Sequence, residues 1–217
     1  MTRACARLIA AATILFTRLI TAFQACWAGC APRPVQRIYY ANHASHCDSL
    51  LIWAALPPAL RRKTRPVAGA DYWLKSRLRR FFATKVFRSV LIDREHLRVG
   101  GGPIKTMAEA LDEGASLILF PEGTRNLTET LLLPFKTGLH HLARKRPEIE
   151  LVPVWLANLN RVLPKGELLP VPLLCQVTFG VPLRLHPEET RADFLTRAHE
   201  ALLSLAPTHA VDERAVA

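Results

Sequence analysis

Residues 35–55, VQRIYYANHASHCDSLLIWAA, contain the sharpest change of pattern in the chain. The run Val35–Ala41 has the length and the aromatic and β-branched content of a buried strand. A polar cluster follows it, and Ser49–Ala55 then continues as an apolar helical segment. A strand, a polar loop and a helix in this order form the repeating unit of an α/β layer fold.

The same order recurs along the chain, where short apolar runs alternate with helical patterns. This alternation predicts a single α/β domain with a largely parallel central sheet flanked by helices. We expect the domain to span residues 32–206 and residues 207–217 to form a mobile tail. The other predicted strands are Pro66–Ala68, Ser89–Ile92, Ser116–Phe120, Leu151–Leu156 and Leu173–Phe179, and the other predicted helices are Tyr72–Ala83, Ile104–Glu113, Gly138–Lys145 and Pro187–Leu203.

Composition excludes several classes of protein. The chain has 217 residues, of which half are hydrophobic and 22% are charged, and its net charge is +11. It is too apolar for a disordered polycation and lacks the repeated apolar spans of a polytopic membrane protein. Its five cysteines include no CxxC pair, which argues against a disulfide scaffold or a structural zinc site and favours a reducing compartment.

The most apolar stretch is Leu8–Ala31. At 100° per residue, Arg3, Arg7 and Arg18 lie on one side of a helix. We therefore expect residues 1–31 to form an amphipathic helix on the surface of an anionic membrane. A helix packed on the domain, a spanning helix and a signal peptide are the alternatives, and Arg18 disfavours the last two because a central charge costs about 2.5–3.5 kcal/mol. The apolar side comprises Leu8, Ile9, Leu15, Phe16, Leu19, Ile20, Phe23 and Trp27, and Thr13, Thr17, Thr21 and Gln24 lie beside the arginines.

Positive charge is concentrated between Arg61 and Lys105, which contains 13 Lys and Arg residues and three acids. Within it, the predicted helix Tyr72–Ala83 combines basic and bulky apolar residues. This combination favours a membrane interface or an acidic partner. A solvated basic helix whose aromatic residues face the core is an equal alternative. No helix-turn-helix, zinc or RNA-recognition motif is present, so we expect no nucleic-acid partner.

The first polar cluster is Asn42-His43-Ala44-Ser45-His46-Cys47-Asp48, directly after a strand. If the chain turns between His43 and Asp48, the carboxylate can hold one imidazole nitrogen and leave the other free as a base. A simple loop hydrogen bond is the alternative. The cluster also contains metal-ligand residue types, but His140 and His141 are adjacent and diverge on a helix, so we expect no metal site.

The second cluster, Phe120-Pro121-Glu122-Gly123-Thr124-Arg125, ends another strand. Gly123 permits a tight turn, Thr124 offers a hydroxyl, and the planar fork of Arg125 matches a phosphate. Glu122 could hold Arg125 or another cation, and the alternative is a polar turn with no ligand. Two smaller motifs are Leu91-Ile92-Asp93-Arg94 at a strand end and the buried run Leu151-Val152-Pro153-Val154.

Together these motifs, NHxxxxD, IDR, FPEGTR and VPV in this order and spacing, resemble the glycerophospholipid acyltransferase family, which includes the 1-acylglycerol-3-phosphate acyltransferases. The resemblance extends from Ile38 to Val154. The chain departs from it at Arg88, where the family usually has glycine.

The resemblance implies that His43 is the general base for the acceptor hydroxyl and that Asp48 orients it. The hydroxyl would attack an acyl thioester directly, without an acyl-enzyme. The implied phosphate-binding residues are Arg94, Glu122, Gly123, Thr124 and Arg125. Weaker candidates are Asn42, Ser45 as a helix cap, Lys136 and Gly138 after the third motif, and Pro153 on the acyl-chain side.

No cofactor is expected beyond the donor substrate, which is acyl-CoA or the acidic acyl carrier protein. The first expectation for the acceptor is 1-acyl-sn-glycerol-3-phosphate, with glycerol-3-phosphate, other lysophospholipids and lyso-aminolipids open. A thioesterase and a non-catalytic binder of anionic lipid or nucleic acid are the other classes. Because thioester donors are cytoplasmic, we expect a peripheral or monotopic protein on the cytoplasmic face of the inner membrane.

Overall fold

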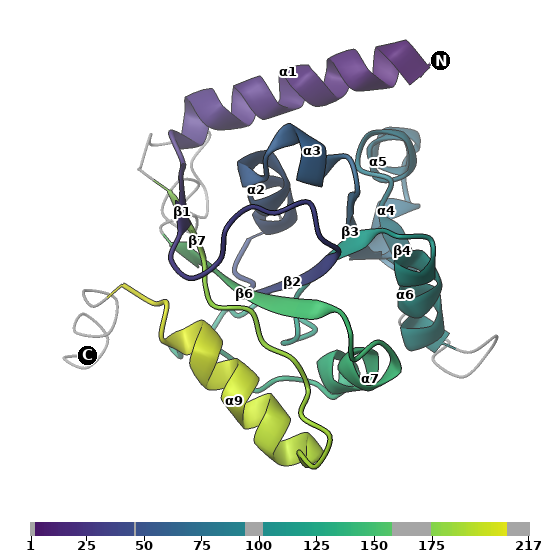
Figure 1. Cartoon of the computed structure of the whole chain (residues 1–217). Helices are drawn as coiled ribbons and strands as arrows, with labels where there is room; N and C mark the ends of the chain where they lie inside the picture. Colours follow the sequence, from purple (N-terminus) through teal and green to yellow (C-terminus); the bar gives the residue numbers. More distant parts are fainter. Residues whose placement is uncertain (1–2, 46, 94–101, 158–174, 208–217) are drawn as a thin grey trace.

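The computed structural model describes residues 3–45, 47–93, 102–157 and 175–207 and is drawn in Figure 1. In these residues the strands form one sheet in the order β1-β7-β6-β2-β5-β3-β4. All neighbouring pairs are parallel except β6 and β7. The predicted α/β fold with a largely parallel sheet is therefore confirmed. The strands are β1 (Gln24–Trp27), β2 (Arg37–Ala41), β3 (Thr64–Gly69), β4 (Val90–Ile92), β5 (Ser116–Leu119), β6 (Glu150–Ala157) and β7 (Gln176–Phe179).

Helices cover both faces of this sheet and enclose two apolar cores (Figure 1). One core lies beneath α6 (Gly102–Asp112), α7 (Gly138–Lys145) and α9 (Arg191–Leu203). The other lies beneath α2 (Asp48–Ala55) and α3 (Pro58–Arg61), with α1 (Arg3–Thr21) outside them. Every residue of β2 is buried, as expected for a central strand that is covered on both faces.

The sheet brings the two polar clusters to the same edge. β2 lies between β5 and β6 and is parallel to both. The carboxyl ends of β2 and β5 therefore lie side by side, and the His43 and Glu122 loops follow those ends. Arg37 at the opposite end of β2 is buried, and its guanidinium contacts Glu150 Oε2 at 3.0 Å and the Ala31 carbonyl at 2.8 Å.

The N-terminal prediction was wrong in its extent. The helix ends at Thr21, and Gln24–Trp27 form β1, which pairs in parallel with β7. Ala22 has φ +40°, so the backbone leaves the helix there. The indole of Trp27 stacks on Phe179 with ring centroids 4.0 Å apart. Phe23 and Trp27, expected on the apolar side of the helix, instead pack beside the core under α2.

Helix α1 is oriented with its threonines toward the protein. Thr17 and Thr21 are each 7% exposed, and their hydroxyls donate to carbonyls four residues earlier in the same helix. Bulky apolar side chains point outward instead, with Leu8 72% and Leu19 70% exposed. Among the described helices, none combines the length and the apolar character needed to cross a membrane.

The predicted helix Tyr72–Ala83 is interrupted. It forms α4 (Ala70–Trp73), α5 (Arg77–Phe81) and a short π-helix, η1 (Phe82–Val86). The break occurs because Ser76 adopts an extended conformation and its Oγ accepts the Arg79 N–H at 3.2 Å, which begins a new helix. Arg88 follows η1 with φ +52°, a conformation that favours glycine.

Part of the basic segment has an internal role. Arg61 donates to the carbonyls of Trp53, Ala54 and Leu56 at 2.7–2.9 Å and so satisfies the end of α2. Arg65 pairs with Glu113 at 2.8 Å. Arg77, Arg79 and Arg80 remain exposed on α5.

Candidate active site

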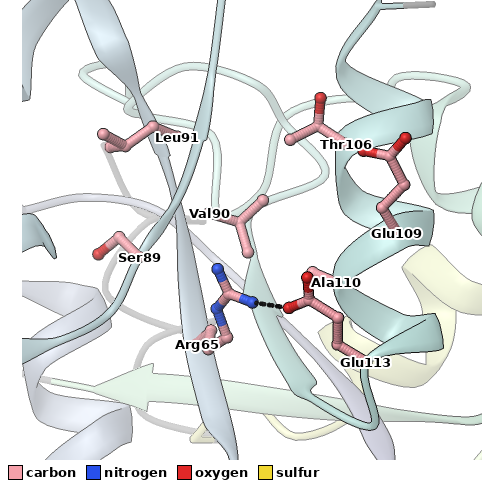
Figure 2. Close-up of a pocket in the computed structure, with 8 residues that line it drawn as sticks. All are labelled: Arg65, Ser89, Val90, Leu91, Thr106, Glu109, Ala110 and Glu113. Atoms are coloured by element: carbon pink, nitrogen blue, oxygen red, sulfur yellow. Dashed lines mark hydrogen bonds and ion pairs between the residues drawn. The ribbon is translucent and has the colours of Figure 1, made fainter.

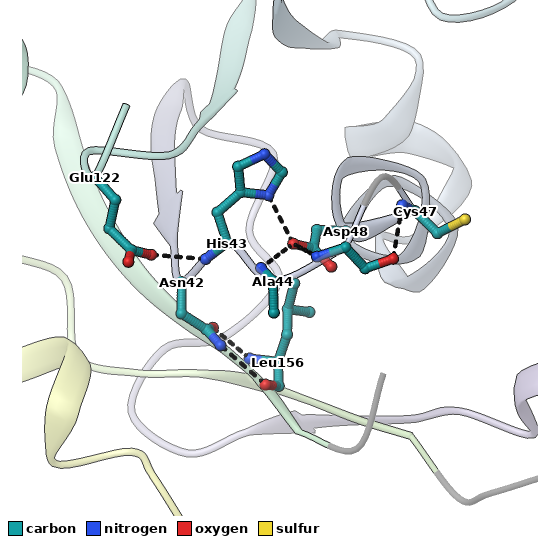
Figure 3. A network of polar contacts seen from close by, with 8 residues as sticks. Asn42, His43, Ala44, Cys47, Asp48, Glu122 and Leu156 are labelled. Carbon is teal, nitrogen blue, oxygen red and sulfur yellow. Dashed lines mark hydrogen bonds and ion pairs between the residues drawn. The ribbon is translucent and has the colours of Figure 1, made fainter. Parts of the chain in front are cut away.

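His43 and Asp48 are in contact, as the spacing predicts. His43 Nδ1 lies 2.7 Å from Asp48 Oδ2 (Figure 3). β2 ends just before His43, and α2 begins at Asp48, so a short turn brings the two side chains together. The Asp48 side chain is 1% exposed, whereas the His43 side chain is 20% exposed.

The surroundings of Asp48 determine the tautomer of His43. Asp48 Oδ2 accepts the backbone N–H of Ala44 at 2.8 Å and of Ser45 at 2.9 Å, in addition to the imidazole. An oxygen that accepts two amides is an acceptor toward the ring as well, so Nδ1 carries the proton. Nε2 is then the unprotonated nitrogen that can act as a base.

The imidazole is also held by a ring contact. It stacks on Phe120 with centroids 4.1 Å apart and planes inclined by 16°. Phe120 directly follows β5, so a residue of the second polar cluster supports the imidazole of His43 in the first cluster. Phe120 is part of the second motif, but its contact with His43 could not be predicted, because ring stacking between distant segments has no local sequence pattern.

Glu122 is 2% exposed and does not face an open site. Its Oε1 accepts the His43 N–H at 2.7 Å, and its Oε2 accepts the Leu133 N–H at 3.0 Å. Burial raises the pKa of the Glu122 carboxyl, while these two amides act in the opposite direction. Both carboxylate oxygens of Glu122 are therefore held by backbone amides of the protein, and its predicted role at the acceptor phosphate stays a prediction.

The turn that follows Glu122 has the features of an anion site. Gly123 has φ +71°, Thr124 is exposed, and Arg125 is half-buried. The exposed Lys136 lies against this turn, since its backbone N–H donates to the Pro121 carbonyl at 2.8 Å. The segment that carries Thr124 and Arg125 thus meets Lys136 after β5, and it also contacts the His43 loop, because the Asn126 N–H donates to the His43 carbonyl at 2.6 Å.

The other weak candidates have structural contacts. The Asn42 side chain exchanges two hydrogen bonds with the Leu156 backbone, at 3.0 and 2.8 Å, and extends the pairing of β2 with β6. Ser45 does not cap a backbone N–H inside α2. Its Oγ accepts the N–H of Cys47, the residue just before the helix, at 3.2 Å. Gly138 begins α7, and Pro153 is buried in β6.

Arg94, predicted to be a phosphate ligand, lies outside the described residues, as do His46, the start of the predicted strand Leu173–Phe179 and most of the C-terminal tail. Within the described part of the chain, no three His, Cys, Asp or Glu side chains are grouped so as to hold a metal ion.

A pocket of about 150 Å³ lies elsewhere, between β3, β4 and α6 (Figure 2). Arg65, Ser89 and Glu113 contribute to its wall. Arg65 is the second residue of β3 and Ser89 precedes β4, so the pocket is at the amino ends of these parallel strands. His43 follows the carboxyl end of β2, so this pocket is separate from the candidate active site.

Comparison with known proteins agrees with the geometry. The chain matches the acyltransferase family over residues 31–157, more than half its length. It is 31% identical over 154 residues to the 1-acyl-sn-glycerol-3-phosphate acyltransferase of Cocos nucifera, covering 68% of this chain and 46% of that protein. It is 23% identical over 172 residues to the Haemophilus influenzae protein of the same name, covering 76% and 66% respectively.

The chain spans about half the length of the first of these curated relatives. A solved structure has the same fold: that of the 1-acyl-sn-glycerophosphate acyltransferase PlsC from Thermotoga maritima superposes with a TM-score of 0.68 at 19% identity, covering 92% of this chain and 79% of that one. With the His43–Asp48 pair in place inside the matched region, the chain belongs to the acyltransferase family.

Proposed function

We propose that this protein transfers a fatty acyl group from a thioester donor to the free hydroxyl of 1-acyl-sn-glycerol-3-phosphate, giving phosphatidic acid. The observation that carries the proposal is the His43–Asp48 contact at 2.7 Å, with Asp48 Oδ2 also occupied by two backbone amides. The names of the relatives support this acceptor.

The geometry suits general-base catalysis without an acyl-enzyme. His43 Nε2 removes the hydroxyl proton as that oxygen attacks the thioester carbonyl carbon. Asp48 stabilises the imidazolium that forms. Collapse of the tetrahedral intermediate breaks the carbon–sulfur bond, and the leaving thiolate takes the proton from the imidazolium. The ester and the free thiol leave, and His43 is neutral again.

The acceptor phosphate is bound at the turn after β5 in this proposal. Gly123 supplies backbone that can approach an anion closely, and Arg125 supplies a guanidinium. Thr124, Lys136 and the undescribed Arg94 complete the set. This places the phosphate on one side of His43 and leaves the acceptor hydroxyl to reach Nε2.

The acceptor is a membrane lipid, so the protein has to reach a bilayer. The outward face of α1 carries Leu8, Leu15, Phe16 and Leu19, which are 60–72% exposed. Such a face is suited to the boundary between headgroups and acyl chains. On α5, Leu78 is exposed among Arg77, Arg79 and Arg80. This surface combines an apolar side chain with positive charge, which suits anionic lipid.

The donor is acyl-CoA or acyl carrier protein. Both are anionic, and both would be attracted by the net charge of +11. Because these thioesters are cytoplasmic, the proposed location is the cytoplasmic face of the inner membrane.

The test uses the full chain with radiolabelled acyl-CoA or acyl carrier protein, each with and without lysophosphatidic acid. We expect label in phosphatidic acid only when the acceptor is present. His43→Ala should abolish transfer, while His141→Ala, an exposed histidine on α7, should leave it intact.

Release of free fatty acid without an acceptor would replace the proposal with a thioesterase. Label entering a different lysolipid or glycerol-3-phosphate, but not lysophosphatidic acid, would correct the acceptor. Transfer that persists in His43→Ala would refute the assignment of the base.

A further inference from the structure

The buried carboxylate of Glu122 joins two loops that come from different parts of the chain. One oxygen accepts the N–H of His43, and the other accepts the N–H of Leu133 (Figure 3 shows the first contact). A buried carboxylate is retained where hydrogen bonds compensate for its lost hydration. Both oxygens of Glu122 have such a donor, so its position is determined by the protein backbone.

Four contacts restrain His43. Its N–H donates to Glu122, and its carbonyl accepts the N–H of Asn126 at 2.6 Å. Its ring is held by Asp48 on one nitrogen and by Phe120 on one face. Three of these four partners belong to the segment that runs from Phe120 to Asn126.

The same segment carries the residues to which we assign the acceptor phosphate. Glu122 is therefore the link between the phosphate-binding turn and the base. A carboxylate would repel a phosphate, which is a second reason why Glu122 does not suit the phosphate itself.

We propose that Glu122 is a positioning residue: it fixes the backbone of His43, and hence the direction of Nε2, without contacting the acceptor. This deepens the proposed function and rests on it. A base displaced by about 1 Å can cost roughly 100-fold in rate. The consequence is a loss in kcat with little change in the KM for the acceptor.

The test is Glu122→Gln, which preserves size and one acceptor oxygen but turns an N–H₂ group toward the second amide. We expect kcat to fall by about 100-fold and the acceptor KM to stay within about twofold. Arg125→Ala should show the opposite pattern, a raised acceptor KM with a smaller change in kcat. Glu113→Gln, on the exposed Glu113–Arg65 pair, is the control and should match the wild type.

A readout that does not depend on turnover separates the two proposals. In ¹³C-labelled histidine spectra, Glu122→Gln should shift the His43 imidazole signal and leave that of His141 unchanged. A wild type that is inert with every acceptor, together with a shifted His43 signal, would overturn the proposed acceptor but keep the positioning role.

Three outcomes would overturn the positioning role. The first is a raised acceptor KM at unchanged kcat, which would make Glu122 a binding residue. The second is wild-type kinetics. The third is a lower kcat and a lower melting temperature with an unmoved His43 signal, which would make Glu122 a general stabiliser.

Discussion

Lys136 occupies the space in which a side chain at position 123 would lie. A Cβ added to Gly123 would be 2.6 Å from Lys136 Cδ and 2.9 Å from its Nζ. The absence of a side chain at Gly123 thus allows the Lys136 ammonium to cross the turn that carries Thr124 and Arg125.

Gly123→Ala should therefore displace Lys136 and weaken acceptor binding. We expect the acceptor KM to rise by roughly 10- to 100-fold, since a charge-assisted hydrogen bond contributes roughly 1.5–3 kcal/mol. Gly114→Ala is a matched control, because Gly114 has a similar φ of +78° but an added Cβ would meet nothing within 4 Å. Both variants should lose about 1–2 kcal/mol of stability from backbone strain. An equal KM in the two variants would show that Lys136 does not bind the acceptor.

Asp48→Asn should fold but turn over slowly. The asparagine oxygen can replace Oδ2 as the acceptor for Ala44 and Ser45, but a neutral amide no longer stabilises the imidazolium that forms on His43. We expect kcat to fall by about 100- to 10,000-fold with an unchanged circular dichroism spectrum. Asp112→Asn, on an exposed ion pair with Arg146, is the control. A kcat within a few-fold of the wild-type value would show that Asp48 does not assist His43 in catalysis.

The outward face of α1 gives a prediction about membrane binding. Leu15→Glu combined with Leu19→Glu should reduce co-sedimentation with anionic vesicles by at least about tenfold, because each leucine contributes roughly 1.5–3 kcal/mol when buried. Thr106→Glu combined with His141→Glu, at exposed positions on α6 and α7, adds the same negative charge and is the control. If the α1 variant bound vesicles as well as the wild type, another surface of the protein would have to make the membrane contact.

Arg88→Gly should stabilise the protein. Arg88 has φ +52°, and relief of that strain outweighs the added entropy of the unfolded chain by about 0.5–1 kcal/mol. Its carbonyl, which accepts Arg65 Nε at 2.8 Å, is retained in the variant. We expect a melting temperature higher by about 1–4 °C, compared with no gain for Arg88→Ala. A destabilised glycine variant would contradict the assignment of strain.

Stability should fall at acidic pH partly through His140. Burial lowers the pKa of His140, and the nearby His141, Arg144 and Arg191 lower it further, while Glu189 opposes them. The unfolded state therefore binds a proton more readily, so this contribution is complete above about pH 6.5 and is lost as the pH falls through the folded-state pKa. His140→Leu should flatten the acid side of a urea-denaturation series. An identical acid slope in both proteins would exclude His140 as a cause.

The sequence predicted those elements whose pattern is local. Gly138–Lys145 was predicted with the bounds of α7, and the strand before His43 was placed within two residues of its start. β1 was missed because Gln24–Trp27 continues an apolar run with helical spacing, and only its pairing with β7 makes it a strand. The break at Ser76 could not be predicted either, because the apolar helical pattern continues across it. The new helix begins there because the Ser76 side chain caps it.

The site divides in the same way. The His43–Asp48 contact follows from five residues of spacing and could be predicted. The place of Glu122 could not, because its partners His43 and Leu133 are 79 and 11 residues away and both contacts are to backbone amides. Of the predicted apolar side of the N-terminal helix, Leu8, Leu15, Phe16 and Leu19 are exposed, whereas Ile9, Phe23 and Trp27 pack beside the core. Thr17 and Thr21, predicted beside the arginines, are buried, and their intrahelical hydrogen bonds allow this burial.

The attachment of β1 to β7 has a geometric consequence for work at a lipid surface. Only Ala22 and Phe23 separate α1 from a strand that is hydrogen-bonded into the sheet and anchored by Trp27. A helix turns by about 100° per residue. One residue inserted within α1 near Thr21 would thus rotate its outward leucines by about 100° relative to the sheet, while the residues around His43 stayed in place. In the proposed function, the short connection between α1 and β1 would set the angle at which the His43 end of the sheet meets a lipid surface.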